Sequence, residues 1–315
     1  MSLFQLKEWW SSRQGDGVEE FDQASMCIGN VDNSAAGRHK IVTGSFAGVL
    51  RIVQPTQSAY SPSHVLLERQ QPEPILQVAL GCFCSPGQTL LAVLHPRALV
   101  LHLVTQPGAA DAEVPPFLEV QQLHRHVIPH AAANMCHGAF GSGRNGQHGI
   151  LVQALDGQLY VFEGGQQVHV TFFDDFLMPG PLAYLPSTDS FVTCASSYEL
   201  HSYSYASIIQ ASQTKAEAAT AAATATATAG GGGGYHLSSK RCASPQWRLL
   251  VGELAVDIQV SAGGSDVVVV GEHTLLVCSE RGELKSQRRL DYHPSAATSY
   301  RHALLLRVSR CKSAL

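Results

Sequence analysis

Short apolar runs on either side of tight turns are the dominant pattern along this chain. The clearest case is residues 149–162, where Asp156-Gly157 separates two runs of alternating apolar residues. This arrangement is a strong hairpin signal, because the turn needs a positive φ that glycine adopts at little cost. The same pattern predicts five β-hairpins, with turns near Gly48, Pro96, Gly157, Ser196 and Glu272.

The spacing of these turns indicates the fold. Apart from the last gap they lie roughly 40–50 residues apart, which is the length of one propeller blade. No convincing helical stripe occurs outside Phe4–Trp10, so alternating strand–helix units with a parallel sheet are disfavoured. We therefore predict an all-β protein with a β-propeller over residues 1–295. An irregular β-sandwich is the alternative.

The last gap is longer because it contains a low-complexity insertion. Alternating alanine and threonine after Ala216 lead into five consecutive glycines, Gly230–Gly234, whose ordering would cost much backbone entropy. Residues 211–245 are therefore predicted to form a flexible Ala/Thr/Gly-rich surface loop, and a docking tether is the less favoured interpretation. Without this loop the chain has length for about five to six blades.

Alternation beside the hairpin turns also predicts part of the core. Successive side chains of a strand point to opposite faces, so apolar residues beside a turn are expected to be buried. The residues expected to be buried on blade strands are Ile41, Val42, Leu91, Val93, Ile150, Val152, Phe191, Val268 and Val270.

Composition narrows the functional classes. The chain has 21 Lys and Arg against 25 Asp and Glu, a formal net charge of −4. A nucleic-acid binder that neutralises phosphates with a basic stripe is therefore disfavoured. Hydrophobic residues make up 45% of the chain and charged residues only 15%. This balance supports a sizeable core and is the opposite of that of a disordered protein.

Cysteine usage and the absence of long apolar runs indicate the compartment. Several of the eight cysteines, such as Cys27 and Cys278, lie inside apolar strand-like runs, which is typical of buried free thiols in a reducing compartment. The first ten residues contain no apolar region of signal-peptide length, and no run approaches the ~18 residues of a membrane span. We expect a soluble cytosolic protein without a transmembrane segment.

A histidine-rich stretch is one candidate for chemistry, because neutral imidazole is a common metal ligand. Its members are His124, His126, His130, His137 and His148. Pro129 interrupts the stretch, no carboxylate lies between its ends, and zinc sites usually show tighter ligand spacing. Metal binding is therefore the less favoured alternative, and we assign no metal site.

Two glycine-rich matches lack the context that their chemistry needs. Gly141–Gly146 fits G-x-G-x-x-G, but an expected strand follows it instead of the helix whose N-terminus would bind a pyrophosphate. Gly44–Gly48 carries its serine one position too early for a nucleophile elbow. Neither match therefore supports a cofactor site or a nucleophile.

Two paired motifs are equally well explained by structure. Cys82 and Cys84 alternate on an expected strand, which suits packing as well as ligation. Asp174 and Asp175 are adjacent, so on an extended chain they point to opposite sides, and a turn before Pro179-Gly180-Pro181 is the simpler interpretation. We predict no catalytic residue, no cofactor and no enzymatic activity.

Longer blocks of the sequence carry a more specific signal than any of these motifs. The blocks include Trp9-Trp10, Glu20–Gln23, Asn30–Ser34, Lys40–Ile52, Pro74–Val78, Leu91–His95, Asn134-Met135, Gly138–Gly141, Asp156–Glu163, Leu177–Tyr184, Thr188–Phe191 and Leu290–Ser295. In this order they resemble the N-terminal region of the Bardet–Biedl syndrome protein 9 family. The resemblance covers about residues 1–295 without the insertion, whereas residues 296–315 match no pattern of that family.

The resemblance implies a seven-bladed propeller in a subunit of the BBSome, a coat-like complex that carries membrane proteins into and out of cilia and supports ciliogenesis. It implies other BBSome subunits as direct partners, and ciliary membrane cargo as an indirect partner. It also implies a place in the cytoplasm, cilium, ciliary membrane, basal body and centriolar satellites. The favoured function is thus a non-enzymatic scaffold. A stand-alone peptide-binding propeller and, less favoured, a metal-assisted enzyme are the alternatives.

The expected limit of the resemblance at Ser295 predicts a shortened product, whether a truncated form, an alternative isoform or an incomplete gene model. Five to six blades do not complete a seven-bladed ring, so exposed apolar faces and strand edges are expected to make the isolated chain self-associate or require a partner. Residues 301–308 are expected to form a short strand or a helix.

Overall fold

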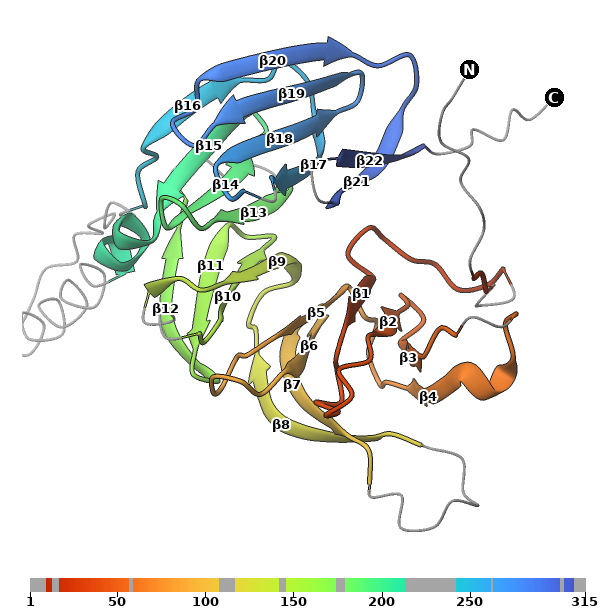
Figure 1. Ribbon diagram of the computed structural model, residues 1–315. Helices are drawn as coiled ribbons and strands as arrows, with labels where there is room; N and C mark the ends of the chain where they lie inside the picture. The colour runs from red at the N-terminus through yellow and green to blue at the C-terminus, as the bar shows by residue number, and fades with distance from the viewer. Residues whose placement is uncertain are drawn as a thin grey trace, which may run out of the picture. The chain divides into compact units, whose positions relative to one another are not determined.

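Five four-stranded antiparallel sheets and one two-stranded sheet make up the described part of the chain (Figure 1). This computed structural model describes residues 10–12, 17–56, 59–107, 117–141, 146–173, 179–212, 242–261, 263–300 and 303–308. In each four-stranded sheet the strands pair in sequence order, as in the up-and-down blade of a propeller. The all-β propeller class and the count of five to six blades expected from the sequence are confirmed.

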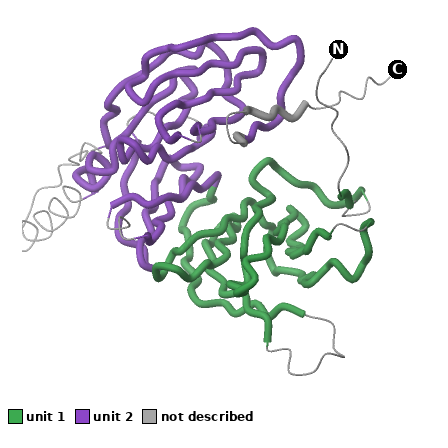
Figure 2. Tube along the Cα trace, in the orientation of Figure 1, with its two compact units in different colours: residues 1–132 green, residues 133–315 purple. Residues whose placement is uncertain are grey.

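Residues 1–132 form one compact unit, which contains two of the sheets (Figure 2). A short 3-10 helix, η1 (Pro62–His64), leads into β4. The strands of the first sheet are β1 (Met26–Gly29), β2 (Lys40–Gly44), β3 (Val49–Val53) and β4 (Val65–Gln70), and those of the second are β5 (Gln77–Gly81), β6 (Leu90–His95), β7 (Ala98–Thr105) and β8 (Glu119–Val127).

Residues 133–315 form the second unit, which contains the other four sheets. A helix at 205–212 follows β15. The strands, by sheet, are β9 (Ala132–Gly138), β10 (Gly149–Ala154), β11 (Gln158–Glu163) and β12 (Gln166–Phe172); β13 (Leu182–Leu185), β14 (Ser190–Cys194), β15 (Glu199–Ser204) and β16 (Trp247–Leu250); β17 (Ala255–Val260), β18 (Asp266–Gly271), β19 (Thr274–Ser279) and β20 (Leu284–Arg289); and β21 (Pro294–Tyr300) with β22 (Ala303–Val308).

The five predicted hairpins are the central strand pairs of the five four-stranded sheets. Each expected turn lies between the second and third strands of its sheet. At the Asp156-Gly157 turn, the amide of Gly157 donates to the Ala154 carbonyl at 3.0 Å, and Gly157 has a φ of 83°. That positive φ is the reason why glycine was expected there.

Whether a residue predicted to be in the core is fully buried depends on which face of its strand it occupies. Val42, Leu91, Val93, Ile150, Val152, Phe191 and Val270 are buried as expected. Ile41 and Val268 are only half-buried, so their prediction is wrong. Ile41 points to the opposite face from Val42, and Val268 to the opposite face from Val267 and Val269, which belong to a core cluster.

The low-complexity insertion begins and ends in one core cluster. Residues 213–241 of the expected 211–245 loop lie outside the described residues, while residues 211 and 212 end the helix at 205–212. Ala211 and Ala243 are buried in the same cluster. The Ser207 hydroxyl donates to the Ser244 carbonyl at 3.2 Å. The two ends of the insertion therefore lie side by side.

The C-terminal segment continues the β structure. β21 and β22 pair antiparallel, and β21 packs against β17 and β18. The Ala297 amide donates to the Asp257 carboxylate at 2.8 Å, which joins the pair to the preceding sheet. Of the two alternatives left open for residues 301–308, the structure has a strand at 303–308; residues 309–315 lie outside the described residues.

One buried histidine belongs to the core of the first unit. His102, on β7, is 4% exposed, and neither ring nitrogen has a hydrogen-bond partner. Burial, together with the nearby His95 and Arg69, lowers the pKa of His102 to about 4. The imidazole is therefore neutral in the folded protein at neutral pH.

Replacing Val152 with Asp tests the central strand of the third sheet. Val152 is fully buried and pairs with Tyr160, so a carboxylate there has no solvent and no partner. We expect a loss of ~3 kcal/mol or more in the free energy of unfolding, measured by denaturant titration. The control is Val168→Asp on β12, where the side chain is 43% exposed. Equal stability of both variants would show that the register of β10 is wrong.

Replacing residues 213–241 with a short Gly-Ser linker tests the insertion. Because its ends lie side by side, closing the shorter loop is expected to change the free energy of unfolding by less than ~1 kcal/mol. A second deletion that also removes the helix at 205–212 should be strongly destabilising, since Tyr205 and Ile208 are buried. Thermal melts compare the two, and a large loss in the first deletion alone would contradict the prediction.

His102 predicts a pH dependence of stability. Its pKa rises from about 4 when folded to ~6.5 when unfolded, so the unfolded state binds the proton first as pH falls. The stabilising effect of the neutral imidazole is complete above pH ~6.5 and is lost between ~6.5 and ~4. We expect His102→Leu to reduce the loss of stability between pH 7 and pH 5 by ~1–2 kcal/mol, whereas the exposed His39→Leu control keeps the full loss.

Candidate functional site

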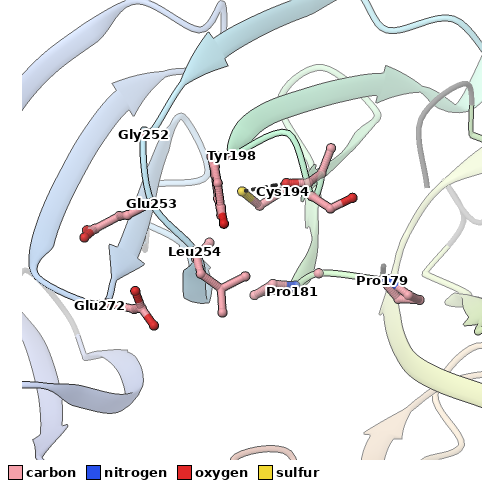
Figure 3. A pocket seen from close by; sticks show the side chains of 12 residues that line it. Pro179, Pro181, Cys194, Tyr198, Gly252, Glu253, Leu254 and Glu272 are labelled. Carbon is pink, nitrogen blue, oxygen red and sulfur yellow. Dashed lines mark hydrogen bonds between the residues drawn. The ribbon is translucent and has the colours of Figure 1, made fainter. Parts of the chain in front are cut away.

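A pocket of about 550 Å³ lies between the sheet β13–β16 and the sheet β17–β20, both in the second unit. Its walls come from the segments that enter β13 and β17 and from the β14–β15 and β18–β19 turns. The side chains that define it in Figure 3 are Pro179, Pro181, Cys194, Tyr198, Glu253, Leu254 and Glu272. A volume of this size is typical of ligand-binding sites.

The entry to β13 forms one wall because the backbone approaches β14 closely. A Cβ atom on Gly180 would lie 2.1 Å from the Cys194 carbonyl oxygen, so only glycine fits. The Asn134 side-chain amide donates to the Gly180 carbonyl at 2.6 Å and holds the segment from the other side. The flanking prolines restrict the backbone further, which makes this wall rigid.

The β14–β15 turn forms the second wall and places an aromatic ring there. Tyr198 has a φ of 61°, a conformation that non-glycine residues rarely adopt. Its carbonyl accepts hydrogen bonds from the amides of Val251 at 2.9 Å and Gly252 at 3.2 Å. These bonds tie the turn to the segment that enters β17. The Tyr198 side chain remains 48% exposed.

The segment before β17 is fixed by a carboxylate clamp. The Glu253 carboxylate accepts from the amides of Thr274 at 2.8 Å and His273 at 3.1 Å, and also from the Thr274 hydroxyl. Because these donors come from the β18–β19 turn, the clamp holds that turn against the pocket. Glu253 is thus a structural acceptor and its charge is already solvated by N–H groups.

The Glu272 carboxylate and the Tyr198 hydroxyl are two polar groups on exposed side chains of the pocket lining. Neither takes part in a hydrogen bond or ion pair with any residue of the described ranges. Leu254, 45% exposed, adds an apolar surface beside them. Burial raises the pKa of the Cys194 thiol, which therefore stays protonated at neutral pH. The site offers acceptors and apolar surface, which suits binding.

The predicted histidine stretch separates into two pairs. His124 and His126 stack on β8 with ring centroids 6.0 Å apart, while His137 and His148 lie 5.8 Å apart in the second unit. Burial, with a smaller contribution from His148, lowers the pKa of His137 to about 4. His130 is exposed between β8 and β9. Among the described residues, no group of three His, Cys, Asp or Glu side chains is arranged to hold a metal ion.

The remaining sequence candidates contribute to structure or lie outside the described ranges. Cys82 and Cys84 follow β5 outside any strand, so placing them on a strand was wrong; Phe83 between them is buried. Ser45 is buried in the β2–β3 turn, where its hydroxyl accepts from the Val49 amide at 3.1 Å. Residues 142–145 of the glycine motif, Asp174 and Asp175 are among those not described.

Sequence reasoning located the two turns that line the pocket but missed its side chains. Glu272 was noted only as a turn position, and Tyr198, Glu253 and Leu254 were not singled out. One signal was available: a tyrosine occupies the position of the β14–β15 turn where φ is positive, and where glycine or asparagine would be expected. No helix in the described ranges has the length and apolarity to cross a membrane.

Comparison with known proteins shows relatives along nearly the whole chain. A family model described as PTHB1 N-terminal matches residues 1–308. Protein PTHB1 of Homo sapiens is 36% identical over 308 residues, covering 95% of this chain and 33% of that protein. Protein PTHB1 of Xenopus laevis is 35% identical over 308 residues, with coverages of 95% and 34%. The chain spans about a third of the length of these relatives.

A solved structure supports the fold. The chain described as BBS1N in complex with ARL6DN, soaked with mercury, aligns with a TM-score of 0.53 and 11% identity, covering 93% of this chain and 90% of that chain. At this identity the likeness bears on the fold alone, and it agrees with the propeller assignment.

These comparisons give the family under the name PTHB1 and correct the extent of the resemblance expected from the sequence. The matching family carries the name PTHB1, and PTHB1 is Bardet–Biedl syndrome protein 9. The resemblance was expected to end after Ser295, whereas the family match continues to residue 308; the expected limit was wrong. The match thus includes β21 and β22. The chain belongs to the PTHB1 N-terminal family, because the family model matches residues 1–308 and the human protein is 36% identical.

Proposed function

We propose that this chain is the propeller part of a BBSome-type subunit and acts as a non-enzymatic interaction scaffold in the trafficking of ciliary membrane proteins. The observation that carries the proposal is the family match, which extends over residues 1–308. The relatives are about three times as long, so the activity of the whole subunit is part of the proposal. The chain would work in the cytoplasm and at the cilium, ciliary membrane, basal body and centriolar satellites as a member of that complex.

The arrangement of the second unit supports a binding role. The pocket is formed by turns and entry segments that a carboxylate clamp and a close glycine contact hold in place. A rigid site on an exposed edge can bind a partner without paying the entropy of ordering its own loops. Direct partners would be other subunits of the complex, and membrane cargo would be reached through them.

Co-purification tests the proposed function. The tagged chain is co-expressed with the other BBSome subunits of the same organism, and we expect it to recover at least one of them at a stoichiometric level. Val152→Asp, which should disrupt the third sheet, is the control for recovery by a misfolded chain. Recovery of no subunit by the parent chain, with a cooperative melt that shows it folded, would contradict the scaffold role.

A stand-alone peptide-binding propeller is the second candidate function. The pocket volume favours it, because about 550 Å³ is enough for a peptide side chain and adjoining backbone. The two candidate functions differ in whether the chain needs other subunits in order to bind its partner. A stand-alone binder retains peptides in the absence of every other subunit and recovers no subunit in the co-purification.

A further inference from the structure

We propose that the pocket between the sheets β13–β16 and β17–β20 binds an arginine side chain presented by an extended segment of a partner subunit. This inference rests on the proposed scaffold function, and it names the chemistry of one contact. Three features of the described residues carry it: an available carboxylate, an exposed aromatic ring and apolar side chains in the same lining (Figure 3).

The carboxylate sets the charge of the occupant. Among the described residues, the pocket is lined by two acidic residues, Glu253 and Glu272, and by no lysine, arginine or histidine. Glu253 already accepts from backbone amides, whereas the exposed Glu272 has no partner among the described residues. The Ser196 Oγ, also in the lining, is buried and lacks a hydrogen-bond partner. A site with free acceptors and negative charge selects a cationic donor.

The aromatic ring favours arginine among the cations. Tyr198 is exposed at the pocket, and a guanidinium can stack on its face while pairing with a carboxylate. A lysine ammonium lacks the planar fork and is more strongly hydrated. The Tyr198 hydroxyl, which also has no partner in the described ranges, is a further acceptor. The two groups come from two different turns that line the same pocket.

Backbone strain at the same residue points to a binding role for the ring. The φ of 61° at Tyr198 is one that asparagine or glycine adopts at lower cost. The tyrosine therefore lowers stability at this turn, as residues at binding sites commonly do. Tyr198→Asn is expected to raise the melting temperature and to weaken binding, a combination that a purely structural role for the ring would not produce.

The apolar walls fit the rest of the occupant. Leu254, Pro179 and Pro181 form a surface beside the two polar groups, suited to the aliphatic stem of an arginine and to an apolar neighbour. The pocket volume of about 550 Å³ leaves room for backbone as well as the side chain. An extended segment with apolar residues beside the arginine meets these conditions.

Peptide binding tests the chemistry directly. The probe is acetyl-Gly-Leu-Arg-Leu-Gly-amide, compared with the same peptide carrying lysine or the neutral isostere citrulline in place of arginine, titrated into the full chain by NMR or calorimetry. We expect the arginine peptide to bind at least about fivefold more tightly than either analogue. Equal binding of the three peptides, or no binding of the arginine peptide at millimolar concentration, would overturn the proposal.

Three variants locate the binding. Glu272→Gln and Tyr198→Asn are each expected to weaken the arginine peptide by about fivefold, with Tyr198→Asn melting at a higher temperature than the parent. Glu283→Gln, an exposed carboxylate in the β19–β20 turn outside the pocket lining, is the matched control and should bind as the parent does. Unchanged binding in Glu272→Gln would exclude this pocket.

Co-purification of Glu272→Gln separates this proposal from the scaffold function. If the parent chain recovers a subunit and Glu272→Gln recovers markedly less, both stand. If both chains recover it equally, the pocket contact is excluded while the scaffold function stands. If the parent binds the arginine peptide selectively but recovers no subunit, the scaffold function fails, and so does the assignment of the occupant to a subunit.

Discussion

In three of the four-stranded sheets the second strand must be covered on both faces, and the rest of the fold depends on this. β6, β10 and β14 are buried at every position, whereas the outermost β20 is exposed at every position. A strand that is buried on both faces cannot be stable in an isolated sheet, because one apolar face would remain in water. Each such sheet therefore needs neighbours on both sides, which is what a propeller architecture supplies.

Polar contacts between loops then determine where the sheet edges lie. In the second unit, the Glu253 carboxylate holds the β18–β19 turn. In the first unit, Asn33 and Thr89 exchange two hydrogen bonds, of 2.9 and 2.7 Å, which join the β1–β2 connection to the β5–β6 connection. Lys40 and Asp32 form a buried ion pair of 2.7 Å beside this contact. Such charged pairs are costly to break, so they favour one arrangement of the loops.

The candidate pocket follows from this arrangement. Four segments, at 179–181, 194–198, 252–255 and at Glu272, meet because two packed sheets bring their turns and entry segments to one edge. The Glu253 carboxylate accepts hydrogen bonds that hold the β18–β19 turn, whereas the Glu272 carboxylate is exposed to solvent. The same edge therefore contains one carboxylate that serves the fold and one that is available to a partner. The distinction depends on which acid faces the backbone amides of the neighbouring turn.

The sequence by itself determined the class of fold and the position of every central hairpin. These hairpins consist of continuous apolar runs joined by turns with special backbone requirements, as at Gly157, and both signals are local. The outer strands were not predicted, because they are polar or half-exposed and so lack a clear apolar pattern. The sequence of β20, for example, is Leu-Lys-Ser-Gln-Arg-Arg. Their strand conformation is imposed by hydrogen bonding to the strand before them.

Tertiary structure alone decided the contents of the site and the faces of individual residues. Val42 and Ile41 are both apolar, yet only the packing of a neighbouring element decides which face is fully buried. Tyr198, Leu254 and Glu272 are ordinary residues in sequence, and the strands β15 to β18 and the insertion lie between Tyr198 and Glu272. They form one pocket because the sheets β13–β16 and β17–β20 pack against each other. Contacts between sheets are long-range, so no local pattern in the chain encodes them.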